Sequence, residues 1–343
     1  MKTWPIATAA VSAVLLAGGA DGAGRARVRA AGAQAAPVRV GVVLKPLDNP
    51  FFVAIYEGAR AEASRRAVPA TFRTVAANDD LAGQAAQVRA LVAQRTGCYV
   101  VNSITGTNLV AALRGVRRPI VTVDSPIDPA AAKRAHLPIR TSIGTDDVEA
   151  GRLGGARMAA LLHGGGEIAL VGGPASNINS GLRLSGFERG IQGSRVRVVA
   201  RVNADYDRTQ AEIEAERILR AHPRISGFLA ASDLMALGIA DALRSAGKTG
   251  MVKVIGIDGL AEALDALRSG SISATVSQYP YVMGRMAVEA CAAAARGARL
   301  PARVDAPIAL LTRGNVARAI AAFPKPFHRY SDPFGRLSAE GAG

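Results

Sequence analysis

The sequence predicts an α/β fold of two doubly wound parallel-sheet lobes joined by three hinge crossovers. From residue 38 onward, short apolar runs alternate with amphipathic segments, and a polar or glycine-containing turn separates them. Strands that alternate with helices form a parallel sheet covered on both faces. These units are too many for one open sheet, and 343 residues suit two domains of roughly 150 residues each.

The expected strands are the short apolar runs that end at turn residues. They are Val38–Leu44, Ala70–Val75, Cys98–Ile104, Ile120–Asp124, Glu167–Val171, Val196–Val202, Gly227–Ala231, Val252–Ile257 and Ile272–Val276.

The first expected helix begins at Asn49 and Pro50, because Asn is a preferred N-cap and Pro suits the first turn. Apolar residues then follow at helical spacing. Further helices are expected at Gln84–Gln94, Asp147–Leu162, Arg208–Arg220, Leu234–Ser245 and Tyr281–Arg296.

The chain is expected to cross from one lobe to the other three times, near Thr141–Asp147, at Gln278–Pro280 and near residues 306–307. The predicted N-terminal lobe comprises residues 38–145 and 279–306. The predicted C-terminal lobe comprises residues 146–278 and 307–323. Residues 324–343 show no periodicity, so a disordered tail is expected there.

The first 36 residues are typical of a secretory signal. Lys2 precedes an apolar run from Pro5 to Ala20, and sites of small residues follow. We expect a signal peptide over residues 1–33 and export to the periplasm, with a disordered cytoplasmic tail as the alternative. No other run reaches the roughly 18 apolar residues of a membrane span, so no direct membrane insertion is expected.

Composition excludes a wholly disordered chain, because 49% of the residues are hydrophobic and 20% are charged. The net charge is +15, but the arginines are scattered over helix faces, which favours a basic solvated surface and no nucleic-acid partner. Two cysteines, Cys98 and Cys291, are too few for a disulfide scaffold or a cysteine-based zinc site. Two buried thiols are the favoured interpretation, and a single bridge is the alternative in an oxidising compartment.

Ligands of open α/β sheets bind beyond the carboxyl ends of the strands, so the residues that follow each strand are the candidate site. They combine planar polar groups with aromatic rings. Sugar hydroxyls both donate and accept hydrogen bonds, and the C–H faces of a sugar stack on aromatic rings. The candidate sugar-binding residues are Lys45, Asn49, Phe51, Phe52, Asp124, Ser125, Arg183, Tyr206, Ser232, Asp258 and Gln278.

Structural roles compete with ligand binding at several of these positions. Asn49 caps a helix in any case, Phe52 lies at core spacing, and Asp124 could cap a turn. Lys45 could lie at a solvated rim, and Arg183 could form a surface ion pair.

Two further acids are expected to be structural. Asp233 is expected to cap the helix 234–245, and Asp147 suits the start of a helix.

Several stretches together resemble the periplasmic binding proteins of ABC sugar importers, in the ribose, allose and galactose group with the type I fold. They are VVLKPLDNPFFVAIYEGARAEA, PIVTVDSPID, SIGTDDVEAGRLGG, ADYDRTQAE, ASDLMALGIADAL, AGKTGMVKVIGIDG and ATVSQYP. The opening stretch is most similar to allose-binding members, which also carry Lys after the first strand.

This resemblance implies a monomer that traps a monosaccharide by hinge closure and delivers it to an ABC permease. It also places the eleven candidate residues at the family's ligand positions. Ser125 stands where ribose binders have Arg and allose binders have Glu, and Ser232 stands where Asn is common. A larger or less hydroxylated ligand would fit these changes. Binders of autoinducer-2 carry a similar combination, so a sensor that signals to a chemoreceptor or histidine kinase is the alternative.

Enzymes and DNA-binding regulators are the remaining classes. The first strand is followed by KPLDNPFF and not by G-x-G-x-x-G, and the four histidines show neither metal-ligand nor Ser-His-Asp spacing. A repressor with this core would need a helix-turn-helix before residue 38, where the signal-like segment stands. We therefore expect no catalysis, no cofactor and no metal.

Overall fold

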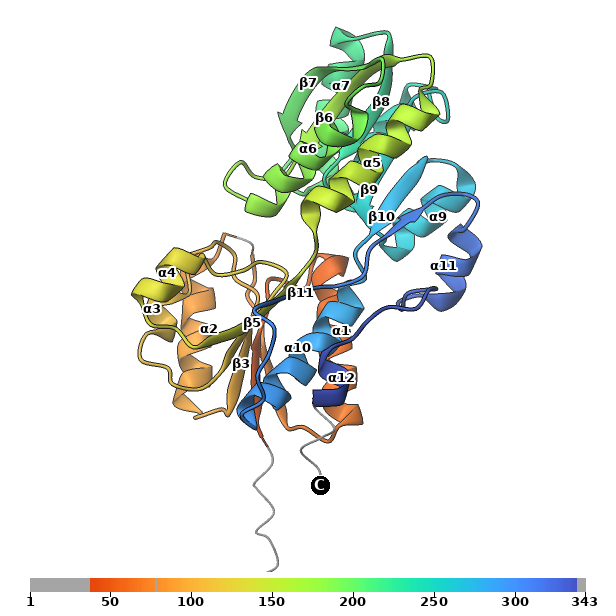
Figure 1. Cartoon of the computed structure of the whole chain (residues 1–343). Coiled ribbons are helices and arrows are strands. Elements are labelled where there is room, and N and C mark those ends of the chain that lie inside the picture. Colours follow the sequence, from red (N-terminus) through yellow and green to blue (C-terminus); the bar gives the residue numbers. More distant parts are fainter. Residues whose placement is uncertain (1–37, 78, 338–343) are drawn as a thin grey trace, which may run out of the picture. The chain divides into compact units, whose positions relative to one another are not determined.

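The computed structural model describes residues 38–77 and 79–337. The predicted signal peptide lies outside the described residues. Two six-stranded sheets form the framework, and helices cover them (Figure 1). Among the described residues, no helix is long and apolar enough to cross a membrane.

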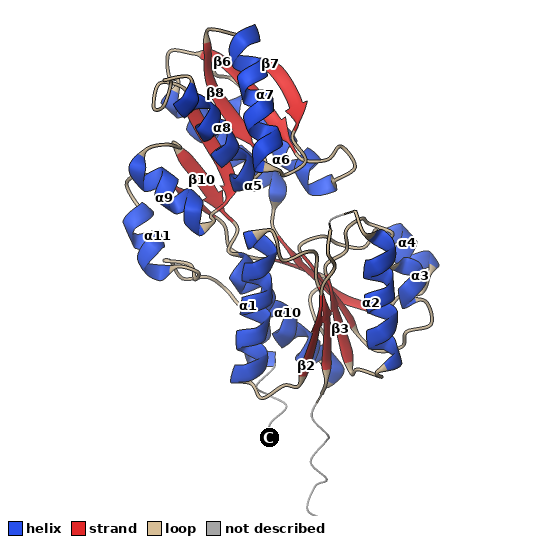
Figure 2. Ribbon diagram, turned by 180° about the vertical axis from the view of Figure 1, so that it is seen from behind, coloured by secondary structure: helices blue, strands red, loops and turns tan. Residues whose placement is uncertain are grey.

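The first sheet is entirely parallel. Its helices lie on opposite faces, with α1 and α10 on one and α2, α3 and α4 on the other (Figure 2). The strand order is β11 (Arg303–Asp305), β5 (Ile139–Gly144), β4 (Ile120–Val123), β3 (Cys98–Val101), β1 (Val40–Val43) and β2 (Ala70–Arg73). The helices are α1 (Pro50–Arg65), α2 (Leu81–Ala93), α3 (Val110–Leu113), α4 (Pro129–Arg134) and α10 (Pro280–Ala295).

The second sheet is parallel except at one edge, where β12 runs antiparallel to β10. Its order is β12 (Ala309–Leu311), β10 (Ala274–Ser277), β9 (Lys253–Asp258), β8 (Ile225–Ala230), β6 (Gly166–Gly172) and β7 (Val196–Asn203). The accompanying helices are α5 (Asp147–Leu161), α6 (Ile178–Ile191), α7 (Arg208–Ala221), α8 (Asp233–Ser245), α9 (Ala261–Ser269) and α11 (Val316–Ala322).

All nine strands expected from the sequence are present, and three further strands were missed. β5 mixes exposed and buried residues, and β11 and β12 have three residues each. Such segments lack the continuous apolar run on which the prediction depended, because they lie toward the sheet edges. The fold class predicted from the sequence is confirmed.

Helix α5 packs unusually close to α6. A Cβ atom at Gly151 would collide with the backbone carbonyl of Arg183, so only glycine allows this approach. The contact fixes the position of the α6 turn that carries Arg183.

The chain crosses from one sheet to the other at three points. These points are the connection from β5 to α5, the connection from β10 to α10, and the connection from β11 to β12. The chain crosses once more beyond α11, because α11 packs against α9 whereas the terminal helix α12 (Phe334–Leu337) packs against α10. The expectation of a disordered tail is therefore wrong for residues 324–337. The aromatic side chains that anchor this segment are irregularly spaced and give no periodic signal.

The two cysteines form a disulfide, so the favoured interpretation of two buried thiols is wrong. Cys98 on β3 bonds to Cys291 on α10, with Cα atoms 5.7 Å apart and both residues fully buried. The two residues are 193 positions apart in the chain, and only the return of α10 to the first sheet brings them together.

Candidate functional site

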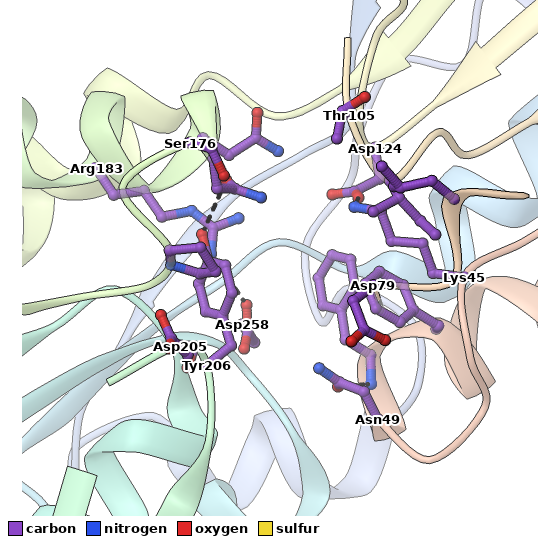
Figure 3. Close-up of a pocket in the computed structure, with 18 residues that line it drawn as sticks. Lys45, Asn49, Asp79, Thr105, Asp124, Ser176, Arg183, Asp205, Tyr206 and Asp258 are labelled. Atoms are coloured by element: carbon purple, nitrogen blue, oxygen red, sulfur yellow. Dashed lines mark hydrogen bonds and ion pairs between the residues drawn. The ribbon is translucent and has the colours of Figure 1, made fainter. Parts of the chain in front are cut away.

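A cavity of about 500 Å³ lies at the carboxyl ends of strands from both sheets. Side chains from the two lobes face each other across it (Figure 3). Nine of the eleven predicted site residues line this cavity: Lys45, Asn49, Phe51, Phe52, Asp124, Arg183, Tyr206, Ser232 and Asp258. Ser125 and Gln278 are not among the lining residues and support them from behind.

On the first-lobe wall, Lys45 is held by three neighbours. Its Nζ lies 2.7 Å from Ser125 Oγ, 3.3 Å from Asp124 Oδ2 and 5.1 Å from the centroid of the Phe52 ring. The Ser125 hydroxyl donates to Asp124 Oδ2 at 3.0 Å. Ser125 thus positions Lys45 and Asp124.

A buried amide also holds Asp124. Asn102, with its amide oriented to satisfy both polar atoms, donates to Asp124 Oδ2 at 3.2 Å. The Oδ2 atom therefore has donors from three side chains. This arrangement leaves Oδ1 as the oxygen of Asp124 that can accept from a ligand.

Asn49 combines a structural role with its place at the cavity. Its Oδ1 accepts from the Phe51 amide at 2.9 Å and caps α1, as the sequence predicted. The rings of Phe51 and Phe52 meet edge to face, with centroids 5.6 Å apart. The cap therefore aims both the Asn49 amide and the aromatic pair at the cavity.

On the second-lobe wall, Arg183 is almost completely buried and fully engaged. Its Nε donates to Asp147 at 2.7 Å, Nη1 to the Ala231 carbonyl at 2.7 Å, and Nη2 to Gln278 Oε1 at 3.0 Å. Burial alone would lower the pKa of Arg183, but Asp147, Tyr206 and Asp258 raise it. The surface ion pair considered for Arg183 is excluded by its 4% exposure.

Asp258 is tied into the same network. Its Oδ1 accepts from Gln278 Nε2 at 2.9 Å and lies 3.6 Å from Arg183 Nη1, and its Oδ2 accepts from the Asp233 amide at 3.2 Å. Burial raises the pKa of Asp258 well above its usual value, and burial likewise raises the pKa of Asp147. Arg183 is the cation that opposes both shifts, so the three groups act as one electrostatic unit.

The caps at α8 differ from the prediction. Ser232 Oγ accepts from the Met235 amide at 3.3 Å and caps the helix, a role expected for Asp233. Asp233 instead accepts from the amides of Gly259 and Leu260 at 2.7 and 2.9 Å and from Thr275 Oγ1 at 2.6 Å. Burial raises the pKa of Asp233 to about 6. Asp233 therefore shapes the loop that carries Asp258.

Tyr206 closes the second-lobe wall. Its hydroxyl donates to Asn177 Oδ1 at 3.1 Å, and its ring occupies the space where any Cβ at Gly173 would lie. Burial raises the pKa of Tyr206 to about 12. The phenol is therefore neutral at physiological pH.

Backbone strain concentrates at this cavity. Four lining residues that are not glycine have positive φ angles: Asp124 (59°), Asp205 (49°), Tyr206 (61°) and Asp258 (141°). Such conformations cost free energy and persist where surrounding contacts enforce them, commonly at binding sites. Here they aim three carboxylates and a phenol at the cavity.

The sequence reasoning missed half of the lining. The missed residues are Asp79, Leu81, Ile104, Thr105, Pro174, Ser176, Asn177, Asn179 and Asp205. They follow β2, β3, β6 and β7. No candidate was chosen after β2 or β3, and only Arg183 and Tyr206 were chosen after β6 and β7. No group of three or more His, Cys, Asp or Glu that could hold a metal occurs in the part of the chain that the structure describes.

The family model for the periplasmic binding protein domain matches residues 40–299, which is most of the chain. The chain belongs to the periplasmic binding protein family. This periplasmic binding protein is 30% identical to the ribose import binding protein of Bacillus subtilis, over 80% of this chain and 87% of the relative. It is 32% identical to the D-allose-binding periplasmic protein of Escherichia coli, over 71% and 80%.

Solved structures share its fold. A solute-binding protein of Actinobacillus succinogenes with bound D-allose has a TM-score of 0.78 at 23% identity, covering 82% of this chain and 99% of its own. A solute-binding protein of Bacillus halodurans with bound myo-inositol has a TM-score of 0.75 at 26% identity, covering 83% and 97%. The family model and the two relatives thus confirm the family predicted from the sequence for this periplasmic binding protein.

Proposed function

We propose that this periplasmic binding protein captures a neutral monosaccharide, a pentose or hexose, in the cavity and delivers it to the permease of an ABC importer. One observation carries the proposal. Two oriented carboxylates, Asp124 and Asp258, face each other from the two lobes beside aromatic rings, and this is the mixture that a polyhydroxylated ring requires.

The charge of the cavity favours a neutral ligand over an anionic one. Four aspartates and two cations, Lys45 and Arg183, are among the lining residues. Lys45 already contacts Asp124, and Arg183 already contacts Asp147. Sugar acids and sugar phosphates would therefore meet uncompensated negative charge.

The lobes supply a mechanism for capture. In the described residues, no hydrogen bond joins Lys45, Asn49 or Asp124 to Arg183, Tyr206 or Asp258, so a sugar bound to both walls would supply the bridging contacts. A ligand shifts a conformational equilibrium by its differential affinity for the two states. Contacts that need both walls would thus drive closure about the crossings at residues 145–146, 278–279 and 306–308.

A thermal-shift screen of residues 37–343 against D-allose, D-ribose, D-galactose, D-xylose, myo-inositol and autoinducer-2 tests the ligand class. A ligand at a hundredfold excess over its Kd stabilises by about 2.7 kcal/mol, which corresponds to a rise of roughly 5 °C in melting temperature. Asp124→Ala should abolish the rise. The exposed Asp265→Ala, on α9 and paired with Arg268, should keep it. A folded protein that responds to no sugar would overturn the proposal.

Delivery is tested separately, by uptake of the radiolabelled sugar in cells that lack the gene. Loss of uptake, restored by the wild-type gene and not by the Asp124→Ala variant, is the expected result. Uptake that persists while chemotaxis to the sugar is lost would instead assign the protein to a membrane sensor.

A further inference from the structure

Residues 323–337, called the strap below, connect the two lobes a fourth time. The strap leaves α11, which packs against α9 beside the second sheet, and ends in α12, which packs against α10 of the first lobe. Its path from α11 down to α12 is visible in Figure 1.

The far end of the strap is anchored firmly to the first lobe. Phe334 is fully buried in the core. The Tyr330 hydroxyl accepts from Arg285 Nη1 on α10 at 3.3 Å, and the Gly335 carbonyl accepts from Arg66 Nη2 at 3.5 Å. Asp332 caps the terminal turn by accepting from the Phe334 amide at 3.0 Å. This end therefore moves with the first lobe.

The middle of the strap contacts both the hinge and the second lobe. The His328 ring packs edge-on against the Tyr279 ring, with centroids 5.7 Å apart. Tyr279 lies in the crossing between β10 and α10, is 6% exposed and has a φ of 49°. The guanidinium of Arg318, on α11, lies 5.0 Å from the centroid of the Phe327 ring.

Closure must disturb these contacts. Only a few residues lie between Ala322, the end of α11, and the first anchored side chains of the strap. When α11 moves with the second lobe, the contact between Arg318 and Phe327 and the packing on Tyr279 cannot both remain as they are. We propose that the strap acts as a tether that holds the hinge in the described arrangement and opposes closure, in a protein that works as proposed above.

The tether is predicted to lower ligand affinity. A protein whose closed state is populated only in part binds with an apparent Kd equal to the intrinsic Kd divided by the populated fraction. One exposed cation–π contact together with one ring contact changes an equilibrium constant by about three- to tenfold. Release of the tether should therefore tighten sugar binding about three- to tenfold, although the strap residues are not among those that line the cavity.

The test is an insertion of Gly-Gly-Ser-Gly-Gly-Ser between Lys325 and Pro326, which lengthens the tether and keeps its anchor. A flexible insertion of this size costs little stability in a surface segment. The matched control carries the same insertion after Gly193, in an exposed turn within the second lobe. Truncation after Lys325 is a second variant, and the insertion decides the question if the truncated chain fails to fold.

Two readouts separate this proposal from the proposed function. The first is the distance distribution between spin labels at the exposed positions Arg117 and Met251, one in each lobe, without ligand. The second is the Kd for D-allose and for D-ribose by calorimetry. The expected result is a shift toward shorter distances and tighter binding with the lengthened strap, and neither change in the control.

Unchanged distances, or weaker binding in the lengthened variant, would overturn the tether while leaving sugar binding intact. Shorter distances in a protein that binds neither sugar would support the tether and count against the proposed ligand class.

Discussion

Arg183 is the cation that makes two buried carboxylates tolerable, and the variant Arg183→Met tests this role. Its side chain is 4% exposed and lies 2.7 Å from Asp147 and 3.6 Å from Asp258, which are 6% and 5% exposed. Methionine keeps much of the volume and removes the charge. Loss of one partner of a buried ion pair costs about 3–5 kcal/mol, because it leaves an uncompensated buried charge.

A nearby ion pair provides the control. Arg152 pairs with Glu149 at 2.6 Å on the same helix, α5, that begins at Asp147. That pair is exposed, so Arg152→Met should cost about 0–1 kcal/mol. The comparison thus holds the distance nearly constant and varies burial.

The assay is urea denaturation followed by circular dichroism, because the single tryptophan, Trp4, lies in the predicted signal peptide. The pH dependence gives an independent readout. Without Arg183 the folded-state pKa values of Asp147 and Asp258 rise further, so the native state takes up protons and the loss of stability should shrink toward pH 5. Equal losses in the two variants, or a loss from Arg183→Met that grows toward low pH, would refute the reasoning.

Two further predictions concern the first lobe. Replacement of both Cys98 and Cys291 by alanine should lower the unfolding free energy by about 4–5 kcal/mol, because the bridge closes a loop of 193 residues. In urea denaturation, dithiothreitol should leave the unfolding free energy of this double variant unchanged and should lower that of the wild type. Burial is the larger cause and contact with Asp332 the next, and together they raise the pKa of Glu289 to about 8. Since an unfolded glutamate titrates near pH 4.3, the native state holds the extra proton between those values, and stability should fall as pH rises through that window, by at most about 1.4 kcal/mol per pH unit. Glu289→Gln should flatten this dependence, and an unchanged slope would contradict the assignment.

Much of the cavity was predictable because one rule places it. Parallel strands end at a common edge, so Lys45, Asp124 and Asp258, each within two residues of the end of a strand, meet there whatever the details of packing. The same rule, applied to β2 and β3, would also have found Asp79 and Thr105, whereas Asn177 follows β6, after which only Arg183 was chosen. Their ligand-binding roles remain predictions.

The sequence did not predict which site residues line the cavity and which hold the lining residues in place. Ser125 and Gln278 follow strands exactly as the lining residues do, yet they hold Lys45 and Arg183 from behind. Ser232 and Asp233 are adjacent, and only the packing of the β9–α9 loop beside them decides which one caps α8. Such choices depend on which neighbours arrive from distant segments.

The sequence by itself determined the alternation of apolar strands with helices, the cap at Asn49 and the edge at which the cavity lies, because periodicity and capping are local properties. Only the tertiary structure decided that Cys98 meets Cys291, that Asp147 holds Arg183, and that residues 324–337 return to the first lobe. Each of these depends on contacts between segments far apart in the chain. Local patterns carry no record of such contacts, because close packing selects them when the whole chain folds.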